Sequence, residues 1–277
     1  MSFLQAIFLG AVQGIAEFLP ISSSGHLSIF QNLFHMQGIG EVDLFFDVLL
    51  HFGTLIAVFV AYWSDIRSIV SEFFTMVHLK KSSQQQTDAA LSRRMFWLLI
   101  VGTLPLLAAI LFKDKAEMLY SNLFFIGFAL LLTGTLLFVS DRYRNGEKSI
   151  KDATVWDALI VGIGQMIAVV PGLSRSGTTI SAGLFRGFDR TFAVKFSFLL
   201  SIPAVLGANL LSLIDAIKEG IDWSLVPCYL AGMAVAAILG YGSILLLKKI
   251  ARSKTFGGFS FYCWGAGLVT LFLALIS

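Results

Sequence analysis

Six apolar runs, each about as long as a bilayer is thick, constrain this chain more than any other feature of its sequence. An α-helix of about 20 residues crosses ~30 Å of hydrocarbon. The runs are Val42–Trp63, Met95–Phe112, Met118–Ser140, Ala193–Ile214, Pro227–Leu247 and Gly257–Ile276. A soluble core of 277 residues cannot hide so much apolar surface, since 57% of the residues are hydrophobic and only 13% are charged. The sequence therefore predicts an all-α polytopic membrane protein.

Two further apolar regions, 3–36 and 156–185, are broken near their middle by short polar segments. Pro20-Ile-Ser-Ser-Ser-Gly25 breaks the first region, and Pro171-Gly-Leu-Ser-Arg-Ser-Gly177 breaks the second. Proline and glycine end helices and free backbone groups, which at membrane depth are tolerated only beside protein or a wet cavity. We expect each region to be a re-entrant helical hairpin with a functional break at its tip.

The two broken regions also resemble each other at an offset of 152 residues. At that offset Gln13 lies over Gln165, and the SxSG pattern of residues 22–25 lies over that of residues 174–177. This match indicates an internal repeat, in which each half holds one re-entrant hairpin and three spans. An odd number of crossings inverts the second half relative to the first, as in many transporter-like folds.

The predicted organisation is one integral membrane domain made of these two inverted repeats. The first repeat is 1–140, with its hairpin at 3–36, and the second is 155–277, with its hairpin at 156–185. Residues 141–154 would form a cytoplasmic linker. The polar stretch Ser64–Ser92 is expected to be a cytoplasmic loop without chemistry of its own.

Basic residues are distributed very unevenly over this topology. On the side that carries the N-terminus they are only Lys113, Lys115 and Lys218. The other side carries 15 lysines and arginines, which lie in segments 64–94, 141–154, 186–192 and 248–256. Cytoplasmic loops are enriched in Lys and Arg. We therefore expect a multi-pass membrane protein in which both termini and the polar breaks of the two hairpins face away from the cytoplasm.

Charged residues are scarce within the two broken regions. Glu17 is the only one from Met1 to Gly40, and Arg175 is the only one from Ala158 to Phe185. A lone ionised group at membrane depth is costly, so it needs a partner or a cavity. Inverted hairpins would bring the two tips together and make Glu17 and Arg175 neighbours. They would either pin the hairpins as a structural ion pair or belong to a functional site.

Both tips carry residue types that bind anions. Glycine-rich turns that lead into a helix offer backbone N–H groups, and arginine holds a phosphate in a bidentate fork. One SxSG pattern is a weak signal, because Ser-Gly also marks ordinary turns. Two copies, one of which contains Arg175, indicate a site for a phosphate-like ligand.

Ser23 and His26 lie three residues apart, which permits contact between a nucleophile and its base across one helical turn. A histidine at this tip would otherwise be a hydrogen-bonded structural residue. Both interpretations stay open at the level of the sequence.

Glu17 follows Gln13 by four residues, so both lie on one helix face. A carboxylate beside an amide oxygen would suit Mg²⁺ or Ca²⁺, although a second carboxylate is missing. Asp47 and His51 form another polar pair at the same spacing, and we expect them to be peripheral to the site.

The residues at both tips resemble the two signatures of one known family. Gln13-Gly-Ile-Ala-Glu17-Phe-Leu-Pro-Ile-Ser-Ser-Ser-Gly-His26 is similar to the (E/Q)xxxE and FLPxSSxGH signature of bacterial undecaprenyl-diphosphate phosphatases, the family tied to bacitracin resistance. Pro171-Gly-Leu-Ser-Arg-Ser-Gly-Thr-Thr179 resembles their second signature, PGxSRSxxT. The likeness covers nearly the whole chain, including the separation of the motifs and the FSFLL segment Phe196–Leu200.

The resemblance implies an enzyme that hydrolyses a C55 isoprenyl diphosphate to the monophosphate carrier of cell-wall glycan synthesis and inorganic phosphate. It implies a catalytic set made of Glu17, Ser23, His26 and Arg175. The supporting phosphate ligands would be Ser22, Ser24, Ser174, Ser176, Thr179 and Gln13. Members of the family need a divalent cation, here Mg²⁺ or Ca²⁺, which Glu17 and Gln13 would hold. Because Gln13 is neutral, this helix does not supply two carboxylate ligands to the cation.

The predicted reaction is in-line attack of Ser23 on the terminal phosphorus, with His26 as base and Arg175 on the diphosphate. Attack by His26 itself and attack by water activated by Glu17 stay open. A rival of another class, a flippase for polyprenyl phosphate without hydrolysis, would use the same repeat and anion cradle but would need no nucleophile. The expected partners are undecaprenyl diphosphate and membrane lipids, with no nucleic acid. The oligomeric state stays open, a homodimer included.

Overall fold

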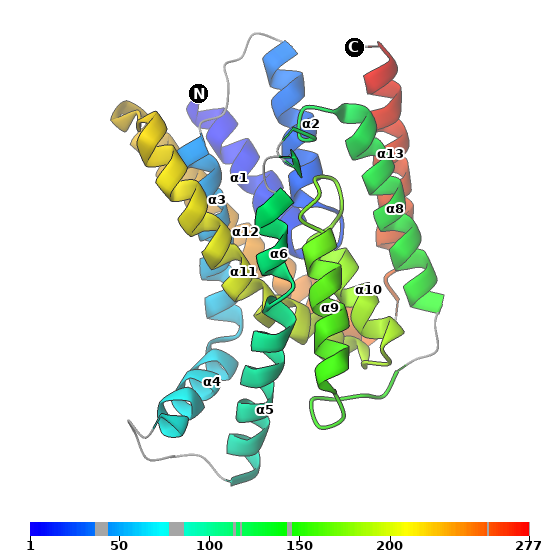
Figure 1. Cartoon of the computed structure of the whole chain (residues 1–277). Helices are drawn as coiled ribbons and strands as arrows, with labels where there is room; N and C mark the ends of the chain where they lie inside the picture. The colour runs from blue at the N-terminus through cyan, green and yellow to red at the C-terminus, as the bar shows by residue number, and fades with distance from the viewer. Residues whose placement is uncertain are drawn as a thin grey trace.

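A computed structural model describes residues 1–36, 44–77, 86–112, 115–116, 118–142, 146–253 and 255–276. Over these residues the chain is an elongated bundle of helices without a β-strand (Figure 1). Large apolar side chains such as Leu111, Phe128 and Leu275 cover its outside. Exposed apolar surface on this scale fits a lipid surround better than water. The prediction of an all-α polytopic membrane protein is confirmed.

Each half of the chain begins with the two helices of a broken region, and the apolar spans follow them. The first half comprises α1 (Phe3–Phe18), α2 (Ser23–Met36), α3 (Leu44–Ala61), α4 (Trp63–Met76), α5 (Gln86–Thr103), α6 (Leu106–Ala109), the short 3-10 helix η1 (Ile110–Phe112) and α8 (Leu123–Arg142). The second half comprises α9 (Val155–Ile167), α10 (Arg175–Phe185), α11 (Arg190–Glu219), the 3-10 helix η2 (Trp223–Leu225), α12 (Val226–Ser253) and α13 (Gly257–Ile276).

Six described segments are long and apolar enough to cross a bilayer. They are Leu44–Ala61, Thr87–Phe112, Leu123–Arg142, Arg190–Lys218, Trp223–Arg252 and Gly257–Ile276, one for each predicted span. Pro105 breaks the second of them between α5 and α6, because proline cannot donate the helical hydrogen bond. Both termini lie at the same end of the bundle (Figure 1), as an even number of crossings requires.

The expectation of a plain loop at Ser64–Ser92 is wrong for the residues that the structure describes there. Residues 63–76 form α4, and α5 already begins at Gln86. Ile66 and Ile69 of α4 pack against the main core, and the buried Glu72 pairs with Arg93 of α5 at 3.3 Å. The amphipathic spacing of the apolar residues, which a search for long apolar runs overlooks, accounts for this helix.

The first helix of each broken region begins with the same type of cap. At α1 the Ser2 hydroxyl accepts from the Gln5 N–H at 3.2 Å, and at α9 the Thr154 hydroxyl accepts from the Asp157 N–H at 3.2 Å. The third-position side chain of each helix completes a capping box. Both hairpins are therefore started by local sequence, at positions that correspond in the repeat.

Glycines let these helices pack closely against the spans. A Cβ on Gly10 of α1 would lie 2.4 Å from the carbonyl oxygen of Gly232 in α12. A Cβ on Gly162 of α9 would lie 2.1 Å from the carbonyl oxygen of Gly102 in α5. Membrane helices associate without a hydrophobic driving force between them, and small residues at their contacts allow the close packing that stabilises the association. These contacts hold α1 against α12 and α9 against α5, and so they position the breaks that follow α1 and α9.

Candidate active site

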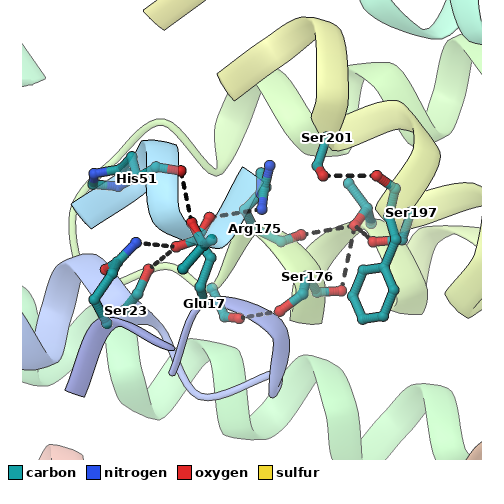
Figure 2. Close-up of polar contacts among 12 residues, drawn as sticks. Glu17, Ser23, His51, Arg175, Ser176, Ser197 and Ser201 are labelled. Carbon is teal, nitrogen blue, oxygen red and sulfur yellow. Dashed lines mark hydrogen bonds and ion pairs between the residues drawn. The ribbon is translucent and has the colours of Figure 1, made fainter. Parts of the chain in front are cut away.

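The tips of the two broken regions meet inside the bundle. Glu17 lies in the last turn of α1, and Arg175 is the first residue of α10. Arg175 Nη2 donates to Glu17 Oε1 at 2.8 Å, so the two lone charges form an ion pair, as expected from the repeat. Figure 2 shows Ser23 and Arg175 approaching the Glu17 carboxylate from opposite sides.

Three side chains donate to the buried Glu17 carboxylate. Ser23 Oγ donates to Oε2 at 2.5 Å, and Gln13 Nε2 donates to the same oxygen at 3.1 Å, while Arg175 holds Oε1. Hydrogen bonds to an ionised group are stronger than neutral ones, and they offset part of the cost of burying the charge. These three donors favour the ionised form of the carboxylate, and the carboxylate in turn orients both the hydroxyl and the guanidinium.

Each tip is closed by the same local hydrogen bond. Gly25 N donates to Ser22 Oγ at 3.2 Å, and Gly177 N donates to Ser174 Oγ at 3.0 Å. Ser22 has a φ of 73°, the left-handed region that costs a non-glycine residue roughly 1–2 kcal/mol. Such strain persists only where the surroundings impose it, and it often marks a functional site.

Hydrogen bonds between the tips join the two halves. Ser176 Oγ donates to the Leu19 carbonyl at 3.2 Å, and Gly172 N donates to Ser24 Oγ at 3.4 Å. Each SxSG pattern therefore bonds to the chain just before the other one, Ser176 to Leu19 and Ser24 to Gly172. These bonds place Ser23 and Arg175 on the same carboxylate.

A cavity of about 380 Å³ opens beside this cluster. Its polar wall includes five residues predicted from the sequence, which are Glu17, Ser22, Ser23, Ser24 and Arg175. Its apolar wall comes from α6, η1 and α11, with Leu106, Leu107, Ile110, Ala204, Val205 and Leu211. A largely apolar pocket with a few convergent polar groups is typical of a ligand site.

The other predicted site residues lie outside the described lining of this cavity, and they are Gln13, His26, Ser174, Ser176 and Thr179. Their hydrogen bonds support the wall instead. Thr179 Oγ1 donates to the Arg175 carbonyl at 2.8 Å and lies 2.6 Å from Ser197 Oγ. These residues therefore do not line the cavity, but they hold Glu17, Ser22 and the first turn of α10 in position.

His26 is held by partners on both ring nitrogens. Nδ1 donates to the Ser22 carbonyl at 2.8 Å, so Nε2 is the acceptor for the Tyr262 hydroxyl at 2.7 Å. The two rings are also stacked, with centroids 5.6 Å apart. The Ser23 hydroxyl bonds to Glu17 instead, so the geometry pairs the hydroxyl with a carboxylate rather than with the imidazole.

Several polar residues that were given no role in the sequence analysis, or only a peripheral one, also line the cavity, and three of them carry a ring or amide nitrogen. They are His51, Gln165 and Asn209. His51 is anchored through Nδ1 to the Asp47 carbonyl at 2.9 Å, and it lines the same cavity as Glu17. The repeat already matched Gln165 with Gln13, and Asn209 is a lone amide in an apolar span. These two features of the sequence could have pointed to Gln165 and Asn209 as site residues.

The fold and this site define an integral membrane protein with a largely apolar cavity, at whose polar end a serine hydroxyl is held on a carboxylate. A family model described as "Bacitracin resistance protein BacA" matches residues 6–269. The chain belongs to this family, and the resemblance noted at the two tips is thereby confirmed.

Full-length relatives carry the name undecaprenyl-diphosphatase. The protein of Methanosphaera stadtmanae is 42% identical, with 100% of this chain and 99% of the relative covered. That of Halothermothrix orenii is 42% identical, with 99% of each chain covered. That of Alkaliphilus metalliredigens is 39% identical, with both chains fully covered at 100%. The similarity therefore extends over spans and tips alike.

Proposed function

We propose that this chain is an undecaprenyl-diphosphatase, which hydrolyses undecaprenyl diphosphate to undecaprenyl monophosphate and inorganic phosphate. The relatives above bear that name, and the family description links the family to bacitracin resistance. The observation that carries the proposal is the 2.5 Å contact of Ser23 Oγ with Glu17 Oε2, in a cavity that Arg175 also lines. A flippase would need the anion site but no hydroxyl on a carboxylate.

Arg175 is placed to bind the diphosphate. Glu17 holds Nη2, whereas Nη1 is buried and has no partner among the described residues. A buried guanidinium nitrogen without an acceptor is costly, so a phosphate oxygen is a natural partner for Nη1. Glu17 thereby orients the arginine before the substrate arrives.

Ser23 and Glu17 would carry out the chemistry. Ser23 Oγ attacks the terminal phosphorus, and its proton passes to Glu17 Oε2. The bridging P–O bond breaks, and the electron pair leaves with undecaprenyl monophosphate. Water then attacks the seryl phosphate, inorganic phosphate departs, and Glu17 returns the proton to Ser23. His26 acts as a positioning residue, because it holds the Ser22 carbonyl next to Ser23.

A divalent cation is part of this proposal. Among the described residues no cluster of three or more His, Cys, Asp or Glu side chains could hold it, so its candidate protein ligands are one carboxylate and one amide oxygen. Gln13 Oε1 is a buried oxygen without a partner among the described residues, and its amide is already bonded to the Glu17 carboxylate. Glu17 and Gln13 would hold Mg²⁺ or Ca²⁺ together with water and substrate oxygens, since these ions prefer oxygen ligands. When bound, the cation would offset negative charge on the transferring phosphoryl group.

The apolar wall suits the isoprenyl part of the substrate. The residues of α6, η1 and α11 continue the cavity away from the charged cluster. A C55 chain leaves hydrocarbon only at a large free-energy cost, so the head group must be reached from within the bilayer. We place the protein in the bacterial inner membrane with both termini on the periplasmic side, because 15 of its lysines and arginines gather on the opposite side.

The test is phosphate release from undecaprenyl diphosphate in vesicles that contain the purified chain and Mg²⁺. We expect one phosphate per undecaprenyl monophosphate from the parent chain and none above background from Ser23→Ala. Thr135→Val, a hydroxyl deletion on α8 outside the cavity, is the matched control and should release phosphate normally. Movement of the lipid between leaflets without phosphate release would contradict the proposal and favour the flippase.

A further inference from the structure

The second repeat contains a buried amide that the reaction above does not use. Gln165, near the end of α9, is 1% exposed and lines the cavity. Neither its amide oxygen nor its amide nitrogen has a hydrogen-bond partner among the described residues. Buried polar groups in native proteins are almost always paired, so this amide requires a ligand or an ordered water as partner.

The first repeat shows what kind of partner such an amide takes. Gln13, which corresponds to Gln165 at the offset of 152, donates through Nε2 to the Glu17 carboxylate at 3.1 Å. The residue that corresponds to Glu17 is Val169, which also lines the cavity. The second repeat therefore keeps the amide but has lost the anionic side chain beside it.

We infer that a phosphate of the ligand binds Gln165, in the place that the Glu17 carboxylate takes beside Gln13. Two further N–H groups support an anion there. Arg175 Nη1 and Asn209 Nδ2 are buried without partners among the described residues, and both side chains line the same cavity. Three unpaired donors around one cavity match one anionic ligand.

The subsite takes the phosphate that is linked to the isoprenyl chain. The inference here rests on the proposed function, in which the terminal phosphate lies at Ser23. Gln165 comes from α9 and Asn209 from α11, and α11 also supplies much of the apolar wall. In this arrangement a diphosphate has one phosphate at Ser23 and the other at Gln165, whereas the product monophosphate keeps only the group that Gln165 binds.

Equilibrium binding of undecaprenyl monophosphate in detergent tests this subsite without turnover. Gln165→Leu removes the amide at similar volume, and we expect it to weaken binding of the monophosphate at least tenfold. Binding of inorganic phosphate, which can occupy the Ser23 end, should change less than threefold. Monophosphate binding equal to that of the parent chain would overturn the inference and leave an ordered water as the partner of Gln165.

A second pair of variants keeps the test decisive if Gln165→Leu does not fold. Val169→Glu places a carboxylate beside Gln165, where it would compete with the ligand phosphate, and Val169→Gln is its neutral match. We expect monophosphate binding to be at least tenfold weaker in Val169→Glu than in Val169→Gln. Equal binding in the pair would overturn the inference. Since binding is measured, a chain that binds but releases no phosphate refutes the proposed hydrolysis and not the subsite.

Discussion

Glu17 and Arg175 form an ion pair whose side chains are only 7% and 19% exposed. Replacing one partner, by Glu17→Gln or Arg175→Met, leaves the other charge buried without its counter-ion. Breaking a buried pair in this way costs about 3–5 kcal/mol. We expect about 3 kcal/mol here, the lower end, because Arg175 keeps some contact with the cavity. The double variant leaves no unpaired charge and should recover most of that loss.

Thermal unfolding in detergent measures the first part of this prediction. A loss of 1 kcal/mol lowers Tm by about 2–4 °C in chains approaching this size, so each single variant should melt about 6–12 °C below the parent. The double variant should melt within about 4 °C of the parent. A double variant that melts as low as the single variants would refute the reasoning that the two charges stabilise each other.

Phosphate release from undecaprenyl diphosphate measures the second part. Each electrostatic contact made in the transition state is worth about 2.7–4 kcal/mol, so both single variants should lose at least about 10²-fold in turnover. The double variant should be as inactive as they are, although its stability is restored. A double variant that regains turnover would show that the pair only pins the hairpins together.

Further outcomes follow from other contacts. A chelator should abolish phosphate release, and added Mg²⁺ should restore it. Gln13→Leu should raise the Mg²⁺ concentration that gives half-maximal phosphate release about tenfold. Phosphate release that is unchanged by the chelator would contradict a role for the cation. Thr179→Val removes one hydrogen-bond partner of the buried Ser197 hydroxyl and should lower the free energy of unfolding by about 1–3 kcal/mol, measured by thermal unfolding. The KM for substrate should stay within threefold of that of the parent chain. A large change in KM without a loss of stability would indicate that Thr179 binds the substrate. A cysteine at the exposed Lys151, in a background without native cysteines, should react in intact cells only with membrane-permeant thiol reagents; labelling by an impermeant reagent would reverse the orientation.

The helices could be predicted from the sequence where hydrocarbon thickness dictates them. All six spans follow from run length, and the breaks at residues 20–25 and 171–177 follow from proline and glycine. Helix α4 was not predicted, because it is amphipathic and only 14 residues long, too short for a search for long apolar runs. Its stability comes from packing against the core and from the Glu72–Arg93 pair, which run length does not reveal.

The charged centre of the site could be predicted for the same reason, since isolated charges at membrane depth must find partners. The hydrogen-bond partners of His26 could not be predicted, because one of them, Tyr262, lies 236 residues away in the sequence. Likewise, only the packing of α3 and α11 brings His51 and Asn209 to the cavity. Sequence motifs select residues near the tips, but tertiary contacts decide which of them face the ligand.

A structure of the chain with undecaprenyl methylenediphosphonate, whose bridging carbon prevents hydrolysis, would locate the substrate directly. We expect the terminal phosphonate at Ser23 Oγ, the second phosphonate at Gln165 and Asn209, Arg175 Nη1 within reach of both groups, and the start of the isoprenyl chain along α6 and α11. A head group bound away from the meeting point of the two hairpin tips would contradict the assignment of this cavity as the site of diphosphate hydrolysis.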